Sequence, residues 1–455
     1  MSDDEIRDKL RHAIQTVKEI IDGEKESGTL QPDYETYGHW NVTSFKYDDE
    51  GVVVNKNGSY IQKPIWIHAS VNVLNKIKKT ELIRNISDFL KNRYEIKEGS
   101  PNFGIFIQKI IGLYLQKENL TESEVNKLIE TFILELNDKP ISVRANIQLV
   151  GLILHPDEIE ICEGVRLKKP KKEDFEIDIP IFGFGFDPHT HYINPTAFLE
   201  ISIPARQPID FQREVVKAET ILRLFKLGSV RVTSYQIYPD SISRFFGGSF
   251  GSMQLFAVLE KYIILEEDVE NLKKNWGVLY RKMPSFLYEF IPKTMEVDHI
   301  SIAYSSFSAS LIESGIEEQR IANVIIGLEA LFLKSEKERN KSNQLSRRIA
   351  QLLSLSPTDS RKIRRVINDA YEVRSIFLHG SRLKNSDRHM VLLKRYNDNP
   401  HELLKLILEY IRKSLLIFLT VEMSKDKIIL LLDNSLISTK DDNELKQRLK
   451  NCICS

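Results

Sequence analysis

Residues 143–150 read Val-Arg-Ala-Asn-Ile-Gln-Leu-Val, and this alternation of apolar and polar side chains decides the fold class. A period of two residues places the apolar side chains on one face of a β-strand. The period returns at residues 159–165, and the Pro156-Asp157 turn between the two segments predicts that they pair. Two further strands are expected at residues 198–204 and 230–238.

A helix is expected between those two later strands. Residues 210–227 carry helical spacing, with Asp210 placed to cap the N-terminal end and Gly228 placed to end the helix. This mixture predicts an α+β region over residues 141–295, which the polar, Pro-containing stretch at 293–297 closes.

Helical spacing dominates the chain on both sides of this region. Residues 1–140 are predicted to be mainly helical, with two strand-like pieces at 42–47 and 60–68. The helices expected in this part cover residues 6–21, 75–93, 103–116 and 122–136. From Val269 onward every strong signal is helical, which predicts an all-α bundle over residues 296–455. The expected fold class is therefore α+β, with a mixed region followed by a helical bundle.

The chain as a whole is electrically neutral. Its 455 residues include 64 basic and 64 acidic side chains, and hydrophobic residues make up 42%. This composition is that of a globular protein, and neutrality excludes a uniformly basic coat for nucleic acid. The distribution of the charges therefore matters more than their sum.

Cysteine usage and the shortness of the apolar stretches predict a cytoplasmic protein. Three cysteines are too few for a disulfide scaffold, and the acidic start predicts no signal peptide. No apolar stretch approaches the roughly 20 residues that span a bilayer. We expect no metal and no cofactor, because Cys452-x-Cys454 and His189-x-His191 lack a ligand cluster at suitable spacing and no Walker-type phosphate loop occurs.

Basic residues concentrate in the helical region. Between Lys341 and Arg395 there are 13 basic and 4 acidic residues, an excess of nine positive charges that the rest of the chain cancels. Such a stripe could bind phosphate groups. The alternative is a solvent-exposed helix surface without a binding role, and the charge count taken alone favours this alternative.

A segment with side chains suited to catalysis lies inside this stripe and reads Tyr371-Glu372-Val373-Arg374-Ser375-Ile376-Phe377-Leu378-His379-Gly380. An arginine offers a planar positive fork for phosphate, and a histidine exchanges a proton near neutral pH. A structural explanation also exists, because Gly380 is placed to end a helix whose C-terminal dipole favours nearby cations. On an ideal helix Arg374 and His379 lie about 140° apart, so a second copy of the chain would complete a shared site.

The pattern Tyr-x-x-Arg-Ser-x-x-x-His-Gly resembles the signature of the HEPN superfamily, specifically its ApeA-like branch. Residues 320–332 resemble the first long helix of that branch, including the acidic residue of Leu-Glu-Ala-Leu-Phe. Residues 345–353 resemble the next helix, and the resemblance as a whole covers about residues 296–423.

The resemblance implies a helical up-and-down bundle that forms a homodimer, with Arg374 and His379 of both protomers facing one cleft. It also implies a metal-independent endoribonuclease in which the ribose 2′-hydroxyl attacks the adjacent phosphate. His379 would act as general acid or base, and Arg374 would stabilise the charged phosphorane. Structured RNA such as tRNA, and a role in anti-phage or stress defence, are expected on the same basis.

Supporting roles are expected for three more residues. Ser375 stands where the motif has Asn and would orient the phosphate or His379. Glu329 would position Arg374 through an ion pair or hydrogen bond rather than act in catalysis, since an unpaired buried charge is costly. Tyr371 is expected to belong to the core more than to stack on a base. RNA contacts are expected from Arg347, Arg348, Arg361, Arg364, Arg365, Arg382 and Lys384.

Residues 1–295 are expected to act as a sensor or restraint, with a trigger or partner that the sequence does not name. Two other functions stay open. One is a non-catalytic HEPN module that binds RNA or a nucleotide or serves dimerisation. The other is the toxin of a toxin–antitoxin pair.

Overall fold

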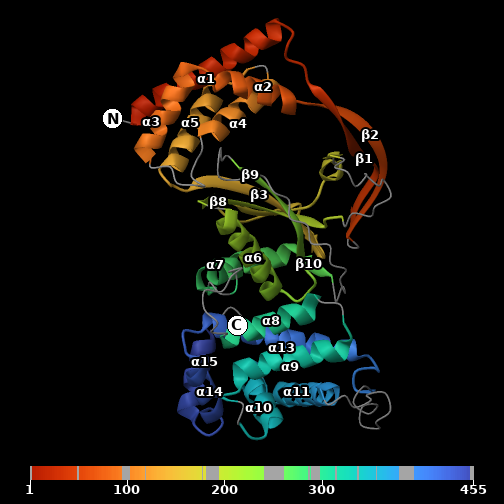
Figure 1. The fold of residues 1–455 in the computed structure, drawn as a ribbon. Coiled ribbons are helices and arrows are strands. Elements are labelled where there is room, and N and C mark those ends of the chain that lie inside the picture. The colour runs from red at the N-terminus through yellow and green to blue at the C-terminus, as the bar shows by residue number, and fades with distance from the viewer. Residues whose placement is uncertain are drawn as a thin grey trace. The chain divides into compact units, whose positions relative to one another are not determined.

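The computed structural model divides the chain by its contacts into two compact units (Figure 1). The described residues are 3–48, 51–94, 103–117, 119–176, 178–180, 194–206, 208–239, 261–284, 287, 298–312, 315–335, 338–354, 356–378 and 394–450. The first unit holds Met1–Leu149, Glu163–Gln212 and Thr233–Gly251, and the second holds Val150–Cys162, Arg213–Val232 and Ser252–Ser455. The three consecutive regions expected from the sequence stay a prediction.

Helices of the first unit share one apolar core. They are α1 (Asp3–Glu26), α2 (Ile67–Ile77), α3 (Glu81–Tyr94), α4 (Phe103–Gln116) and α5 (Glu122–Leu136). In that core Phe106 of α4 and Phe132 of α5 stack with ring centroids 4.5 Å apart. The helices expected at 6–21, 103–116 and 122–136 are confirmed. The one expected at 75–93 is instead α2 and α3, because Thr80 bonds back to the Ile77 carbonyl through its amide and its hydroxyl and so closes α2.

A long antiparallel hairpin follows α1 in the first unit. Strand β1 (Asp33–Asp48) pairs with β2 (Gly51–Ile65) along its whole length, with a register shift between Val42 and Ser44. The short strand β7 (Asp178–Pro180) pairs with the other edge of β1. The strand-like pieces expected at 42–47 and 60–68 identify only part of this hairpin, because the polar run at 55–59 breaks the apolar alternation.

Strands β3 (Ile141–Val150), β8 (Ala197–Ala205) and β6 (Val165–Lys168) form antiparallel pairs with β8 in the middle. The strand expected at 198–204 is confirmed as β8. The expected pairing of residues 143–150 with 159–165 is wrong, since β3 pairs with β8. After β3, Gly151 takes a positive φ, and the chain leaves that sheet.

The second unit contains a small parallel sheet and most of the described helices. Strand β4 (Leu152–Leu154) pairs in parallel with β10 (Tyr262–Ile264). The remaining elements of the chain are β5 (Glu158–Cys162), η1 (Lys172–Phe175), α6 (Pro208–Phe225), β9 (Arg231–Pro239), η2 (Glu266–Asp268), α7 (Val269–Lys282), α8 (His299–Ile312), α9 (Glu317–Phe332), α10 (Lys341–Leu353), α11 (Pro357–Leu378), α13 (Pro400–Thr420), α14 (Lys425–Asn434) and α15 (Thr439–Lys450). The strand expected at 230–238 is confirmed as β9. The α+β fold class with a helical C-terminal region is likewise confirmed.

The helix expected at 210–227 is confirmed as α6, but its ends differ from the expectation. The helix already begins at Pro208. Asp210 therefore lies inside its first turn, where its carboxylate accepts a hydrogen bond from the Arg206 amide at 3.1 Å. The helix ends at Phe225, ahead of Gly228.

Helix α6 is bonded to the C-terminal helices of the second unit. Arg412 of α13 donates to the last carbonyls of α6, with its Nη1 at 2.6 Å from Leu224 O and 2.8 Å from Phe225 O. Arg223 of α6 donates to Ser308 Oγ of α8 at 3.1 Å. The last carbonyls of a helix have no partner within it, so Arg412 both satisfies them and places a cation at the negative end of the helix dipole.

Helices α8, α9 and α13 cross closely at Gly327. A Cβ atom at this position would lie 2.6 Å from Ile411 Cδ1 and 2.9 Å from Ser306 Cβ. Gly327→Ala is therefore expected to lower the free energy of unfolding by about 1–3 kcal/mol, the usual cost of overpacking. Urea denaturation followed by circular dichroism measures this change.

Gly277→Ala in α7 is the matched control for Gly327→Ala. Beyond the neighbouring backbone of α7 itself, no heavy atom of the described residues lies within 4 Å of a Cβ placed at Gly277. Alanine is the better helix former, so we expect the control to stabilise by up to about 1 kcal/mol. Equal effects of the two substitutions would contradict the close crossing at Gly327.

Candidate functional site

The candidate site is built where α11 packs against α9. The buried face of α11 consists of Ile363, Val366, Ile367, Ala370 and Val373. Arg374 follows directly on Val373 in the sequence and sits at the edge of this face, where its side chain is partly buried. The neighbouring helix α9 presents Glu329 to it.

Arg374 and Glu329 form the ion pair that the sequence analysis expected. Arg374 Nη2 donates to Glu329 Oε2 at 3.0 Å, and the two side chains are 21% and 16% exposed. Within the described part of the chain, Arg374 Nε has no hydrogen-bond partner. This nitrogen is buried, so a further acceptor would meet the other N–H donors of the guanidinium, which carries five in all.

Tyr371 lies one turn before Arg374 on α11. The guanidinium carbon of Arg374 is 5.3 Å from the centroid of the Tyr371 ring, a distance at which a cation is attracted to the ring face. Burial, together with the charge of the Glu329 carboxylate, raises the pKa of Tyr371. Tyr371 itself is only partly buried. Arg374, Glu329 and Tyr371 thus form one contiguous group, called the Arg374 cluster below.

His379, the expected partner of Arg374, lies outside the described residues, and so do Arg382 and Lys384. The description of α11 ends at Leu378. Ser375 is described, and it is partly buried on α11 next to Arg374 in the sequence. That Arg374 and His379 face one shared cleft therefore stays a prediction.

Four exposed cations line the N-terminal half of α11. They are Arg361, Lys362, Arg364 and Arg365, called the α11 cation cluster below. The helical period places Arg364 on the same flank as Tyr371 and Ser375, and about 15 Å along the axis from Arg374. Arg364 also donates to Asn343 Oδ1 of α10 at 3.3 Å. Lys362 was not among the residues expected to contact RNA, and it joins the cluster because the structure shows it exposed beside the other three cations.

Arg347 and Arg348, also expected to contact RNA, are engaged inside the fold instead of in this cluster. The Arg348 side chain is 2% exposed, and its Nε and Nη2 donate to Asp433 at 2.8 and 2.9 Å. It also pairs with Glu338 at 2.6 Å and donates to the Phe332 carbonyl at 2.7 Å. Arg347 pairs with Asp433 at 3.0 Å. Phosphate would have to compete with these carboxylates.

Arg348 keeps its charge in this setting. Burial opposes the charge, but the bonds to Asp433 and Glu338 outweigh it and raise the pKa of Arg348. Asp433 lies far from Arg348 in the sequence, and Glu338 lies in the loop before α10. Helical spacing in the sequence therefore identified neither partner. A buried guanidinium with two carboxylates is typical of a structural ion-pair network.

The described residues hold neither a cluster of metal ligands nor a membrane-spanning helix. No group of three or more His, Cys, Asp or Glu side chains there is placed to hold a metal ion. None of the helices described there is both long enough and apolar enough to cross a bilayer. His189, His191, Cys452 and Cys454 lie outside the described residues.

The chemistry of the Arg374 cluster follows from its groups. A guanidinium can bind an anionic oxygen through its accessible N–H donors, and the adjacent carboxylate fixes its orientation. The α11 cation cluster extends positive charge along the same helix.

No protein-family model, no curated protein and no solved structure matches this chain.

Proposed function

We propose that this chain is a cytoplasmic, metal-independent endoribonuclease that acts in anti-phage or stress defence, with Arg374 and His379 as its catalytic residues. The observation that carries the proposal is the Arg374–Glu329 ion pair, which holds a partly exposed guanidinium beside the Tyr371 ring. The α11 cation cluster supports it, because exposed cations on the same helix attract the RNA backbone.

In the proposed reaction, the ribose 2′-oxygen bonds to the adjacent phosphorus, and the bond from phosphorus to the next 5′-oxygen breaks. His379 accepts the proton of the 2′-hydroxyl, and the His379 of a second protomer donates a proton to the leaving 5′-oxygen. Arg374 stabilises the additional negative charge of the phosphorane. The products are a 2′,3′-cyclic phosphate and a 5′-hydroxyl end. A homodimer with one shared cleft is part of the proposal.

Removal of either catalytic side chain is expected to abolish cleavage. Arg374→Ala and His379→Ala should each lower the cleavage rate by about 100-fold or more, the usual cost of losing a general acid–base or a charge-stabilising donor. End-labelled tRNA, resolved on denaturing gels in the presence of EDTA, measures the rate. Phosphatase treatment that removes the 3′ phosphate only after acid opening identifies the cyclic end.

Arg281→Ala serves as the control for these substitutions. Arg281 is exposed on α7 in the same unit, and it undergoes the same chemical change without touching the proposed site. The control should cleave like the wild type. Wild-type rates in both Arg374→Ala and His379→Ala would overturn the proposal.

A second candidate function rests on the α11 cation cluster alone. The cluster lies roughly 13–20 Å from Arg374 along the helix axis, so it can bind RNA whether or not the Arg374 cluster reacts. The same gels, run beside a filter-binding assay, separate the two functions. Salt-sensitive binding without any product would favour a non-catalytic RNA-binding module.

A further inference from the structure

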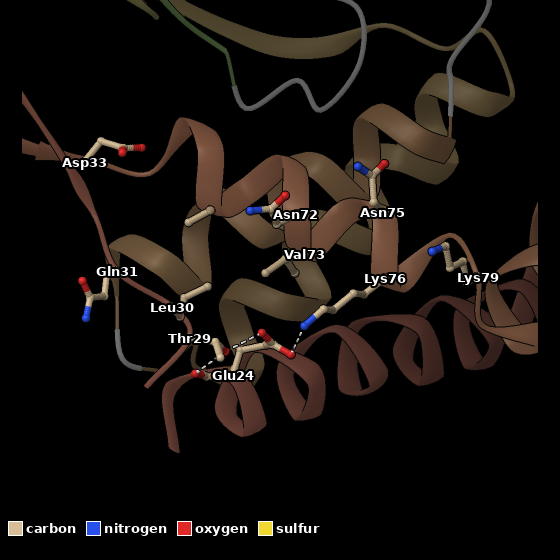
Figure 2. Close-up of a pocket in the computed structure, with 11 residues that line it drawn as sticks. Glu24, Thr29, Leu30, Gln31, Asp33, Asn72, Val73, Asn75, Lys76 and Lys79 are labelled. Atoms are coloured by element: carbon tan, nitrogen blue, oxygen red, sulfur yellow. Dashed lines mark hydrogen bonds and ion pairs between the residues drawn. The ribbon is translucent and has the colours of Figure 1, made fainter. Parts of the chain in front are cut away.

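The first unit contains a cavity of about 560 Å³ at the C-terminal end of α1 (Figure 2). Its wall combines the end of α1, the loop that follows, the first residue of β1 and one side of α2. Sites for small molecules typically measure about 300–1,000 Å³. The cavity therefore has the size of a small-molecule site, and none of the motifs in the sequence pointed to it.

A polar row from α2 lines one side of this cavity. Asn72, Asn75, Lys76 and Lys79 recur at positions i, i+3, i+4 and i+7, which brings them to one side of α2 and the turn after it. Figure 2 shows the row running along α2, with Asp33 across the hollow from Asn72. Among the described residues, the side chains of Asn72, Asn75 and Lys79 have no hydrogen-bond or ion-pair partner, and all three are exposed, so two amides and one ammonium group are open to a ligand.

Lys76, by contrast, is held in place. Its Nζ bonds to the Glu24 carboxylate, which also accepts a hydrogen bond from Thr29 Oγ1 at 2.7 Å. The bonds to Lys76 and Thr29 lower the pKa of Glu24, so this carboxylate is charged at neutral pH. Two lysines and two carboxylates, Glu24 and Asp33, then line the cavity, and their formal charges cancel.

Apolar side chains complete the lining. Ala69 and Val73 of α2 are buried, and Leu30 of the loop is partly buried beside them. Since Ala69 is 7% and Val73 1% exposed, Leu30 supplies the apolar surface on which the face of a planar ring can lie. The asparagine amides can pair with the donors and acceptors of a nucleobase edge. The ammonium group of Lys79 adds a point charge for an anion.

We propose that this cavity binds a small ligand that joins a planar, hydrogen-bonding ring to a single anionic group, of which a nucleoside monophosphate is the simplest example. The ring lies on Leu30, its edge meets Asn72 and Asn75, and the anion meets Lys79. Since the cavity is neutral overall, a triphosphate finds no matching excess of cations. The monophosphate is therefore the preferred form.

Isothermal titration calorimetry on the full-length protein tests this proposal. The probes are the four common nucleoside monophosphates, the matching nucleosides, ATP and inorganic phosphate. At least one monophosphate is expected to bind ten times or more tightly than its nucleoside, than inorganic phosphate and than ATP. Failure of every monophosphate to bind at millimolar concentration, or tighter binding of ATP, would overturn the proposal.

Three variants locate the binding. Asn72→Leu and Lys79→Gln should each weaken binding of the best monophosphate by ten times or more. Lys78→Gln is the control, because Lys78 is an exposed neighbour that does not line the cavity. Thermal melting of all variants checks that they fold alike. Equal affinities of the three variants would place the ligand elsewhere and refute the assignment of the cavity.

Discussion

Arg348→Met is expected to lower the free energy of unfolding by about 3 kcal/mol, the lower end of the range for removing one partner of a buried ion pair. Methionine has a similar length but leaves Asp433 and Glu338 without the cation between them. These carboxylates are 21% and 14% exposed, against 2% for Arg348. The lower end applies because Asp433 keeps Arg347 as a partner. Urea denaturation at neutral pH measures the difference.

Arg347→Met is the matched control on the neighbouring position. The Arg347 side chain is 34% exposed and shares Asp433 with Arg348. Exposed pairs contribute about 0–1 kcal/mol, so the control should lose no more than that. A loss as large as that of Arg348→Met would show that burial does not set the difference between the two positions.

The pH dependence of Arg348→Met gives a second check. Burial alone would raise the pKa of Asp433, but the bonds to Arg348 outweigh it and lower the pKa. The stabilisation is therefore complete above the ordinary aspartate pKa of about 3.9 and is lost as the pH falls through the lowered value. The gap between wild type and Arg348→Met should narrow in acid, and a gap independent of pH would contradict the ion-pair explanation.

A fragment of residues 296–455 is expected not to fold cooperatively on its own. Within the second unit, α6 and α7 bond to the helices of this fragment. Arg412 would lose the two α6 carbonyls, and Tyr304 would lose its hydrogen bond to Thr220 Oγ1 at 2.8 Å. Thr420 O would lose the Lys282 ammonium group at 2.9 Å. The apolar side chains of α7, among them Leu272, Trp276 and Leu279, would be missing from the core.

A fragment of residues 208–455 provides the comparison, since it restores α6 and α7. Thermal melting followed by near-ultraviolet circular dichroism, together with binding of a hydrophobic dye, distinguishes a packed core from a loose one. We expect fixed packing to return at least in part in the longer fragment. Equally sharp melting of both fragments would show that residues 296–455 form an independent domain.

Local periodicity explains which elements could be predicted from the sequence. The apolar positions of α1, α4 and α5 recur at helical spacing and are buried, so their local pattern sufficed. Strand pairing was different. Residues 143–150 alternate clearly, but β3 pairs with β8, which follows it by about 50 positions, and not with the nearer residues 159–165. Alternation carries no information about such a partner.

The candidate site shows the same division between local and distant information. The Arg374–Glu329 pair was predictable because a carboxylate in a mostly apolar helix needs a partner, and Arg374 was the partner expected for it. The engagement of Arg348 was not predictable, since its partner Asp433 lies 85 positions away. A basic residue on the surface and one inside an ion-pair network look alike in the sequence.

The bond between Arg412 and the end of α6 has a consequence for synthesis on the ribosome. Arg412 follows Leu224 by 188 positions, so α6 emerges long before the helix that caps it. At roughly 5–20 residues per second, the nascent helix waits on the order of 10–40 s. During that interval Ile221 and Leu222, buried in the finished protein, have no completed bundle to cover them. The half-made chain is thus the form most in need of a chaperone.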